Sequence, residues 1–246
     1  MQGYDDATYG DRFADVYDDW YGDDVDTDAA VDALAGLAAG RTVLELGVGT
    51  GRLALPLARR GLAVTGLDSS QAMLDRLATK DGGDSVRPVL GTMEGPLPEG
   101  PFGLVFVARN TLFNCTADGA HERCLRAAAA VLEPGGAVVV EAFVPDDSPE
   151  RSSVSVRSVE ADRVVLFVDR HDPDTQEAWS SIVELTPSGN RFRPAHIRYA
   201  TPDQLDAVAA RAGLVLTERW ADWTRAPFGP DSEAHVSVYR LAEPAP

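Results

Sequence analysis

Apolar and polar positions along the first 150 residues repeat in the manner of alternating strands and helices. Short apolar runs, each typical of a parallel strand buried on both faces, occur near 42–47, 62–67, 86–90, 102–107 and 136–142. The spacing of apolar and Ala residues predicts helices near 27–39, 51–60, 70–79 and 118–132. This alternation predicts an α/β fold with helices packed on a largely parallel sheet.

The pattern changes between about 153 and 200. Four segments there alternate apolar and polar residues, with turn sequences between them: Val154 to Val156, Val164 to Val168, Trp179 to Leu185 and Phe192 to Tyr199. Consecutive strands joined by turns imply an antiparallel sheet inserted after the fifth strand. Thr201-Pro202 then begins a helix that reaches about Ala212, and strands near 214–221 and 234–241 follow it.

Composition and charge narrow the class of protein. The 246 residues include 39 acidic and 22 basic side chains, a net charge of −17, which argues against a nucleic-acid partner because phosphate binding requires positive charge. No run of 18 or more apolar residues occurs and the N-terminus is acidic, so we expect a cytoplasmic protein without a membrane span or secretory signal. Cys115 and Cys124 lack the spacing of metal ligands, and we expect free thiols and no metal site.

The first 40 residues combine acidic and aromatic side chains. They contain eleven Asp and one Arg, a net charge of −10, which would attract a cationic cofactor or an amine substrate. Tyr9, Phe13 and Tyr17 recur every four residues, which places them on one face of a helix, and Trp20 follows. We predict that the segment is either a lid that orders over a bound ligand or a helix packed permanently on the sheet.

A glycine-rich turn follows the first strand, with the spacing Glu45-x-Gly47-x-Gly49-x-Gly51. Alternate glycines allow positive φ angles and leave no side chain between the backbone and a ligand. A helix that begins near Gly51 would direct its free N–H groups and dipole toward that ligand. Asp68 ends the second strand, where its two oxygens can accept hydrogen bonds from the hydroxyls of a ribose. These residues predict a site for a nucleotide cofactor.

The spacing of Glu45 and the glycines resembles motif I of the class I S-adenosylmethionine (SAM)-dependent methyltransferases. A dinucleotide-binding dehydrogenase would share part of it, since Gly49-x-Gly51-x-x-Ala54 matches the looser fingerprint of that family, although Arg52 stands at the third glycine of the strict one. Glu45 has no role beside a pyrophosphate, but it suits the cationic methionine end of SAM. We therefore expect SAM as the cofactor and S-adenosylhomocysteine (SAH) as its product.

The resemblance implies a Rossmann-like, seven-stranded sheet of order 3-2-1-4-5-7-6 with an antiparallel last strand. In this arrangement residues 1–40 form a helical lid. The SAM-binding core comprises 41–150 and 201–246. The antiparallel insert at 151–200 is expected to be a substrate lid or a platform for a homodimer.

The resemblance also implies cofactor contacts. Gly47, Gly49 and Gly51 are expected beneath the methionine part, and Glu45 near its ammonium group. Asp68 is expected to bind the ribose. The other implied contacts are Ser69 and Met73 beside the ribose, Thr92 and Met93 at the adenine, Ala108 at the methionine, and Tyr17 and Trp20 as walls of the sulfonium. Thr92 departs from the family pattern, which usually has Asp at this position.

Residues at the ends of the fourth and fifth strands are expected to face the substrate, where ligands of such sheets bind. These are Arg109, Asn110, Phe113 and Glu141. Ion pairing is the structural alternative for Arg109 and Glu141. His196 and Tyr199 lie on opposite faces of the segment at 192–199, and either could remove a proton if that strand covers the cleft. His121 is expected to be exposed on a helix away from the cleft.

Together these features favour a SAM-dependent methyltransferase that acts on a small molecule, with secondary metabolism as the expected setting. The alternative is a protein of the same fold that binds SAM but serves as a cyclase or as a ligand-sensing module.

Overall fold

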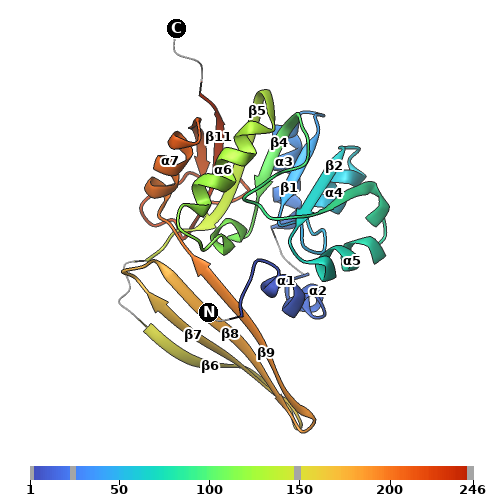
Figure 1. The fold of residues 1–246 in the computed structure, drawn as a ribbon, viewed down its shortest axis with the longest axis vertical. Helices are drawn as coiled ribbons and strands as arrows, with labels where there is room; N and C mark the ends of the chain where they lie inside the picture. The colour runs from blue at the N-terminus through green and yellow to red at the C-terminus, as the bar shows by residue number, and fades with distance from the viewer. Residues whose placement is uncertain (1–2, 23–25, 147–150, 243–246) are drawn as a thin grey trace.

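The central feature of the fold is a seven-stranded sheet with helices on both faces (Figure 1). The computed structural model describes residues 3–22, 26–146 and 151–242. The strands follow the order β10–β11–β5–β4–β1–β2–β3. This is the predicted order 3-2-1-4-5-7-6, and β11 is antiparallel to both of its neighbours. The bounds are β1 (Val43–Leu46), β2 (Val64–Asp68), β3 (Val86–Leu90), β4 (Phe102–Val107), β5 (Leu132–Phe143), β10 (Leu214–Trp220) and β11 (Ala234–Leu241).

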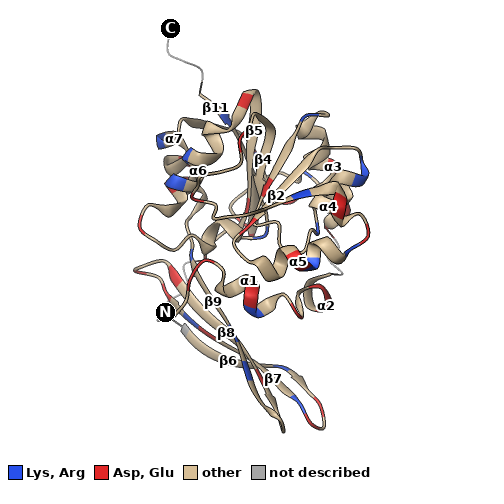
Figure 2. Cartoon of the chain, turned by 45° about the vertical axis from the view of Figure 1, so that its right-hand side comes forward, with Lys and Arg blue, Asp and Glu red and all other residues tan. Residues whose placement is uncertain are grey.

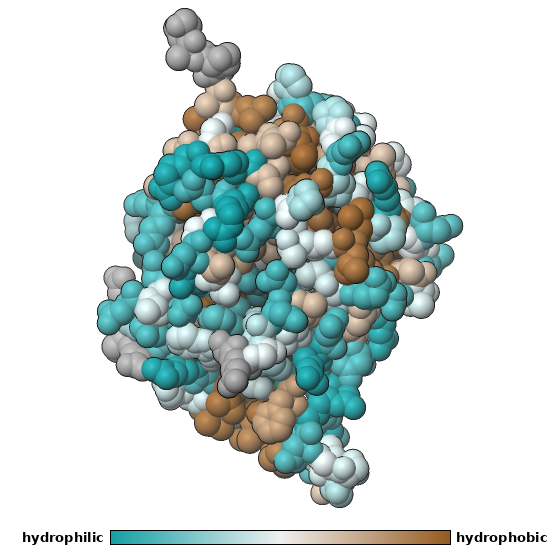
Figure 3. All heavy atoms as spheres, viewed as in Figure 1, coloured by the Kyte–Doolittle hydropathy of each residue, from teal (hydrophilic) through white to brown (hydrophobic). Residues whose placement is uncertain are grey.

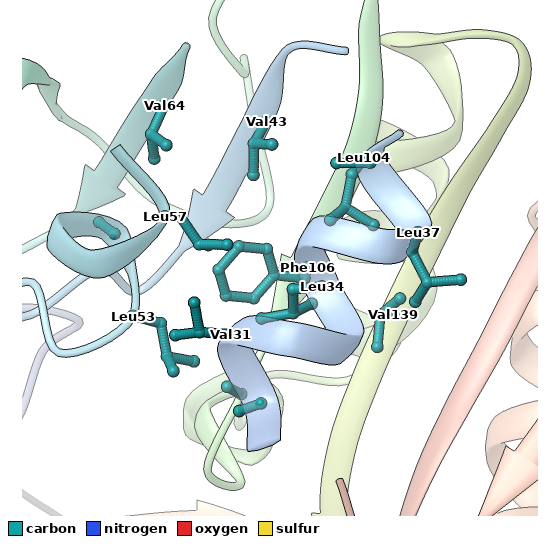
Figure 4. Close-up of a cluster of buried hydrophobic side chains, with 14 of the residues drawn as sticks. Val31, Leu34, Leu37, Val43, Leu53, Leu57, Val64, Leu104, Phe106 and Val139 are labelled. Atoms are coloured by element: carbon teal, nitrogen blue, oxygen red, sulfur yellow. The ribbon is translucent and has the colours of Figure 1, made fainter. Parts of the chain in front are cut away.

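Hydrophobic side chains fill the space between this sheet and its helices. Every residue of β1 and β4 is buried, which explains their largely apolar sequences. On one face, Leu34 and Leu57 pack with Phe106 (Figure 4). A second cluster joins the helices of the other face to the sheet. The helices are α3 (Thr27–Ala38), α4 (Ala54–Arg59), α5 (Gln71–Thr79), α6 (Ala120–Ala130) and α7 (Pro202–Arg211). None of the helices in the described ranges is long and apolar enough to cross a membrane.

The starts of the helices follow local backbone chemistry. α4 begins at Ala54 rather than near Gly51, because Gly51 has a left-handed φ of 87° that a helix cannot include. The helix therefore begins three residues after the predicted position. α7 begins as predicted, since the Thr201 hydroxyl accepts a hydrogen bond from the Gln204 N–H and the Gln204 side chain accepts one from the Thr201 N–H.

A second, antiparallel sheet follows β5 in the chain and extends away from the core (Figure 1). Its four strands confirm the predicted insert and lie in the order β6 (Arg151–Val159), β7 (Val164–Asp172), β8 (Glu177–Thr186) and β9 (Gly189–Arg198). Hydrophobic side chains gather on this end of the molecule (Figure 3), where β6 exposes Val154 and Val156. The role of the insert as a substrate lid or dimer platform stays a prediction.

Two short helices of the N-terminal segment lie between the core and the insert (Figure 1), and both carry acidic residues (Figure 2). α1 (Thr8–Phe13) packs against α5 and β9, and α2 (Tyr17–Tyr21) follows after a turn. The single continuous helix implied by the four-residue spacing is therefore wrong. Tyr9 and Tyr17 belong to separate helices, and Phe13 is buried beside residues of α5, β7 and β8.

Candidate active site

The turn between β1 and α4 brings bare backbone to the carboxyl edge of the sheet. Gly47, Gly49 and Gly51 all have left-handed φ angles, which favour glycine. A Cβ atom on Gly47 would lie 2.3 Å from Thr111 Cγ2, and one on Gly51 would lie 2.3 Å from Leu77 Cδ1. A Cβ atom on Gly49 would have no atom within 4 Å. Close packing therefore requires glycine at 47 and 51, whereas Gly49 borders open space.

Asp68 joins this turn to the end of β2. Its Oδ2 atom accepts a hydrogen bond of 2.7 Å from the Gly49 N–H, and its Oδ1 atom accepts one of 2.9 Å from the Ser70 N–H. Burial raises the pKa of Asp68, and the backbone hydrogen bonds oppose that rise. Each carboxylate oxygen can accept a further hydrogen bond, so the buried acid is held in place and can still bind hydroxyl groups.

A cleft of about 770 Å³, partly open to solvent, lies between these loops and the N-terminal segment. That volume includes space that is continuous with the solvent outside the cleft. Three tyrosines of the N-terminal segment, Tyr4, Tyr9 and Tyr17, line one side. The residues predicted as cofactor contacts that line the cleft are Tyr17, Gly47, Gly49, Asp68, Ser69, Met73, Thr92 and Met93.

Glu45 is buried beneath the glycine turn and does not line the cleft. Burial raises the pKa of its carboxyl group to about 8, Arg52 opposes this rise, and Asp68 adds to it. Its Oε2 atom has no hydrogen-bond partner among the described residues. A buried carboxylate oxygen without a partner is costly unless a cationic or donor group satisfies it. The position therefore fits a positively charged ligand group above the turn.

Comparison with known proteins decides the family. The family model described as a methyltransferase domain matches residues 43–136. The cypemycin N-terminal methyltransferase of a Streptomyces species is 31% identical over 184 residues, which cover 72% of this chain and 74% of that protein. The chain belongs to the SAM-dependent methyltransferases. The expectation of SAM rather than a nicotinamide cofactor is thereby confirmed.

Solved structures resemble this methyltransferase over nearly its whole length. The CcbJ methyltransferase from Streptomyces caelestis is 42% identical, with a TM-score of 0.89 over 97% of this chain and 100% of that one. A sugar N-methyltransferase from Streptoalloteichus is 17% identical, with a TM-score of 0.71 over 97% of this chain and 96% of that one. The second likeness shows the fold alone.

The residues of the methyltransferase fit SAM. Gly49 offers backbone without a side chain, and Asp68 offers acceptors for ribose hydroxyls. Glu45 is buried outside the cleft lining, with a carboxyl oxygen that has no partner among the described residues. Three of the predicted contacts, Glu45 among them, lie outside the cleft lining. Gly51 packs against Leu77, and Ala108 is buried at the end of β4 outside the cleft lining.

Trp20 also lies outside the cleft, which corrects its predicted role as a wall of the sulfonium. The guanidinium groups of Arg157 and Arg193 lie over its ring at 4.6 and 5.1 Å from the centroid. Trp20 therefore joins α2 to the insert. Tyr17 does line the cleft; burial raises the pKa of its hydroxyl, and the charge of Arg109 opposes that rise. Arg109 does not itself line the cleft.

Three residues predicted to face the substrate have structural roles instead. The Glu141 Oε2 atom accepts a hydrogen bond of 2.7 Å from the Arg109 N–H, and the Asn110 Oδ1 atom accepts one of 2.6 Å from the Phe143 N–H. Asn110 and Glu141 therefore hold the ends of β4 and β5 together. Phe113 is fully buried, with its ring centroid 5.2 Å from that of Phe143, so it cannot face an acceptor.

The cleft includes residues that the sequence did not indicate. Thr111, Asn114 and Cys115 line it instead of Asn110 and Phe113. Arg109 and Asn110 have left-handed backbone angles. The chain therefore changes direction after β4, and other side chains than the predicted ones reach the cleft. Asn is enriched in the left-handed conformation, so Asn110 was the one residue in the sequence that could have indicated this turn. Glu94 also lines the cleft and pairs with Arg123 at 2.6 Å.

The predicted proton acceptors, His196 of β9 and Tyr199 directly after that strand, do not line the cleft. His196 is buried, its ring stacks on Trp179 at 5.3 Å, and burial lowers its pKa. The Tyr199 hydroxyl is hydrogen-bonded to His171 Nε2. His121 is half-buried and not exposed as expected, and this burial lowers its pKa to about 4. The burial of these histidines depends on tertiary packing, which local sequence patterns do not reveal.

Proposed function

We propose that this methyltransferase transfers a methyl group from SAM to the nitrogen of a small-molecule amine in secondary metabolism. The observation that carries the proposal is the charge of the cleft. Four carboxylates, those of Asp5, Asp6, Asp68 and Glu94, line it, whereas no Lys, Arg or His is among its described lining residues. Such a cleft attracts cationic molecules and disfavours carboxylates and phosphates.

The name of one relative supports a nitrogen acceptor. That relative is the cypemycin N-terminal methyltransferase of a Streptomyces species, which is 31% identical to this chain. We propose only the chemistry that this name implies, an amine nitrogen.

When bound, SAM supplies a methyl carbon activated by its sulfonium. The nitrogen lone pair forms the new C–N bond as the C–S bond breaks, sulfur keeps the electron pair, and the methylated nitrogen then loses a proton to solvent. Positioning of the two reactants can supply about 7–11 kcal/mol of the barrier. Burial raises the pKa of Tyr9 and of Tyr17, so both stay protonated and present neutral aromatic walls. Aromatic faces attract cations, which suits the charged groups on both sides of the reaction.

A panel of matched probes tests the proposal. It comprises a short peptide with a free N-terminus and its N-acetylated form, and an amino sugar and the corresponding hydroxyl sugar. Release of SAH from SAM is measured with each probe. We expect turnover with one or both amines and none with their matched partners. Turnover of the hydroxyl sugar or the acetylated peptide, with both amines inert, would contradict the proposal.

A further inference from the structure

The short 3₁₀ helix after β4 presents two polar side chains to the cleft. This helix, η2 (Thr111–Asn114), begins after the left-handed residues Arg109 and Asn110. Side chains three residues apart eclipse one another in a 3₁₀ helix, so Thr111 and Asn114 share one face. Both line the cleft, whereas the two residues between them are buried in the core.

Thr111 places this face beside the cofactor end of the cleft. Its Cγ2 atom lies where a Cβ atom on Gly47 would approach within 2.3 Å, so Thr111 packs directly on the motif I turn. Asn114 lies one turn farther along the same face. η2 packs against β9 of the insert, and Tyr4, which also lines the cleft, accepts a hydrogen bond of 3.3 Å from the His196 N–H on that strand. Asn114 therefore lies where the cofactor site meets the insert.

The two asparagines of this turn differ in their partners. The Asn110 side chain accepts a hydrogen bond from the Phe143 N–H. The Asn114 side chain has no hydrogen-bond partner among the described residues, although it lines the cleft. Polar groups in such positions are satisfied by water or by a ligand. Its carboxamide oxygen accepts hydrogen bonds but carries no charge. It can thus bind an amine N–H without stabilising the protonated ammonium form, as a carboxylate would.

We propose that the Asn114 Oδ1 atom accepts a hydrogen bond from the acceptor amine and directs the nitrogen lone pair toward the methyl group. This role rests on the proposed amine acceptor. Asn114 contacts the substrate without adding a charge that would favour the ammonium form, so the lone pair of the neutral amine remains available for attack. Thr111 on the same face separates this position from the glycine turn.

The experiment uses the full chain and whichever amine probe, the peptide or the amino sugar, is turned over. Asn114→Leu removes the acceptor atom, and we expect kcat/KM for the amine to fall about tenfold or more, the worth of one hydrogen bond. SAH affinity, measured by calorimetry, should change less than twofold. Asn114→Asp keeps an acceptor but adds a charge that raises the pKa of the bound amine. The acid limb of the pH profile of kcat, which reports groups in the enzyme–substrate complex, should therefore move to higher pH in this variant.

Asn110→Leu is the matched control, since it removes a hydrogen bond within the protein and should lower the melting temperature. Wild-type kcat/KM and pH profile in both Asn114 variants would overturn the proposal. Loss of SAH affinity in Asn114→Leu in proportion to kcat/KM would also overturn it, because Asn114 would then belong to the cofactor site. Turnover of the hydroxyl sugar with the amines inert would instead refute the proposed function, whatever the variants do.

Discussion

The Oδ2 atom of Asp68 accepts a hydrogen bond of 2.7 Å from the Gly49 N–H. This bond connects the acid at the end of β2 with the most open position of the glycine turn after β1. It brings together the two motif elements that are separated in sequence, and it fixes the carboxylate at the cleft that both residues line.

Asp68→Ala should weaken SAH binding by about tenfold to a hundredfold, because it removes the acceptors for a ribose and the bond that holds the turn, each worth about 1.4 kcal/mol or more. Asp75→Ala is the control, since Asp75 is an exposed acid of α5 that accepts a hydrogen bond of 2.7 Å from the Gln71 side chain. Calorimetric titration with SAH compares the variants. Equal affinity in both variants would exclude Asp68 from the cofactor site.

Glu45→Gln should change how stability depends on pH. The folded-state pKa of Glu45 is about 8, above its usual 4.5, because burial disfavours the charged form. The folded state therefore keeps a proton that the unfolded state releases, so this group's contribution is full below about pH 4.5 and is lost as pH rises toward 8. The loss is at most about 1.4 kcal/mol per pH unit.

Gln has no proton to lose, so its contribution to stability does not fall with pH. The difference in melting temperature between Glu45→Gln and wild type should therefore increase in favour of the variant between about pH 5 and about pH 8. Thermal unfolding at several pH values measures the difference. A difference that stays constant with pH would show that Glu45 does not titrate with a raised pKa.

Gly10→Ala should separate α1 from the cofactor loop. A Cβ atom on Gly10 would lie 2.3 Å from Ser70 Cβ. Ser70 donates its backbone N–H to the Asp68 carboxylate, so a shift at Ser70 would disturb the cofactor loop. We expect SAH affinity to fall about tenfold, equivalent to about 1.4 kcal/mol. In wild type, SAH should also protect residues 4–22 from hydrogen exchange, since the tyrosines of this segment line the cleft.

Gly36→Ala is the control for the previous variant, because a Cβ atom there would approach only Arg225, at 3.8 Å. Alanine within α3 should slightly stabilise the protein. If SAH protects 47–52 but leaves 4–22 unchanged, the N-terminal segment is a permanent scaffold and not a lid.

Arg193→Met should loosen the contact between the N-terminal segment and the insert. The Arg193 side chain is fully buried and bonds Asp15 at 2.9 Å and Glu184 at 3.1 Å. Its loss should cost about 2 kcal/mol, as expected for charge-assisted hydrogen bonds. Arg191→Met is matched, because the exposed Arg191 pairs with the same Asp15 oxygen. Exposed pairs contribute little, so we expect under about 1 kcal/mol there. Equal destabilisation in denaturant unfolding would contradict this account.

The succession of strands and helices and the glycine turn could be predicted because their signals are local, whereas the sheet order followed from the resemblance to the class I methyltransferases. The apolar runs of β1 and β4, the spacing from Glu45 to Gly51, and the cap at Thr201 each depend on neighbouring residues in the sequence. The acceptor side could not be predicted in the same way. Arg109 and Asn110 have left-handed backbone angles, so the residues after them do not continue the geometry of β4. A prediction that extends the strand places Phe113 at the cleft, whereas the structure places Asn114 there.

The histidines and the N-terminal helices show a second limit. His196 is buried by Trp179 and contacts Tyr4, and these residues come from different parts of the chain. The break between α1 and α2 depends on packing against both the core and the insert. Such tertiary contacts leave no periodic signal in the sequence.

The most direct test of the account is transfer of a deuterated methyl group from labelled SAM to the amino sugar or peptide probe, with the product analysed by mass spectrometry and NMR. The account predicts that the label appears on the amine nitrogen, with one SAH formed for each methylated product, and that Asp68→Ala reduces both in parallel. Label on oxygen or carbon, or SAM bound by calorimetry without transfer to either amine, would contradict it.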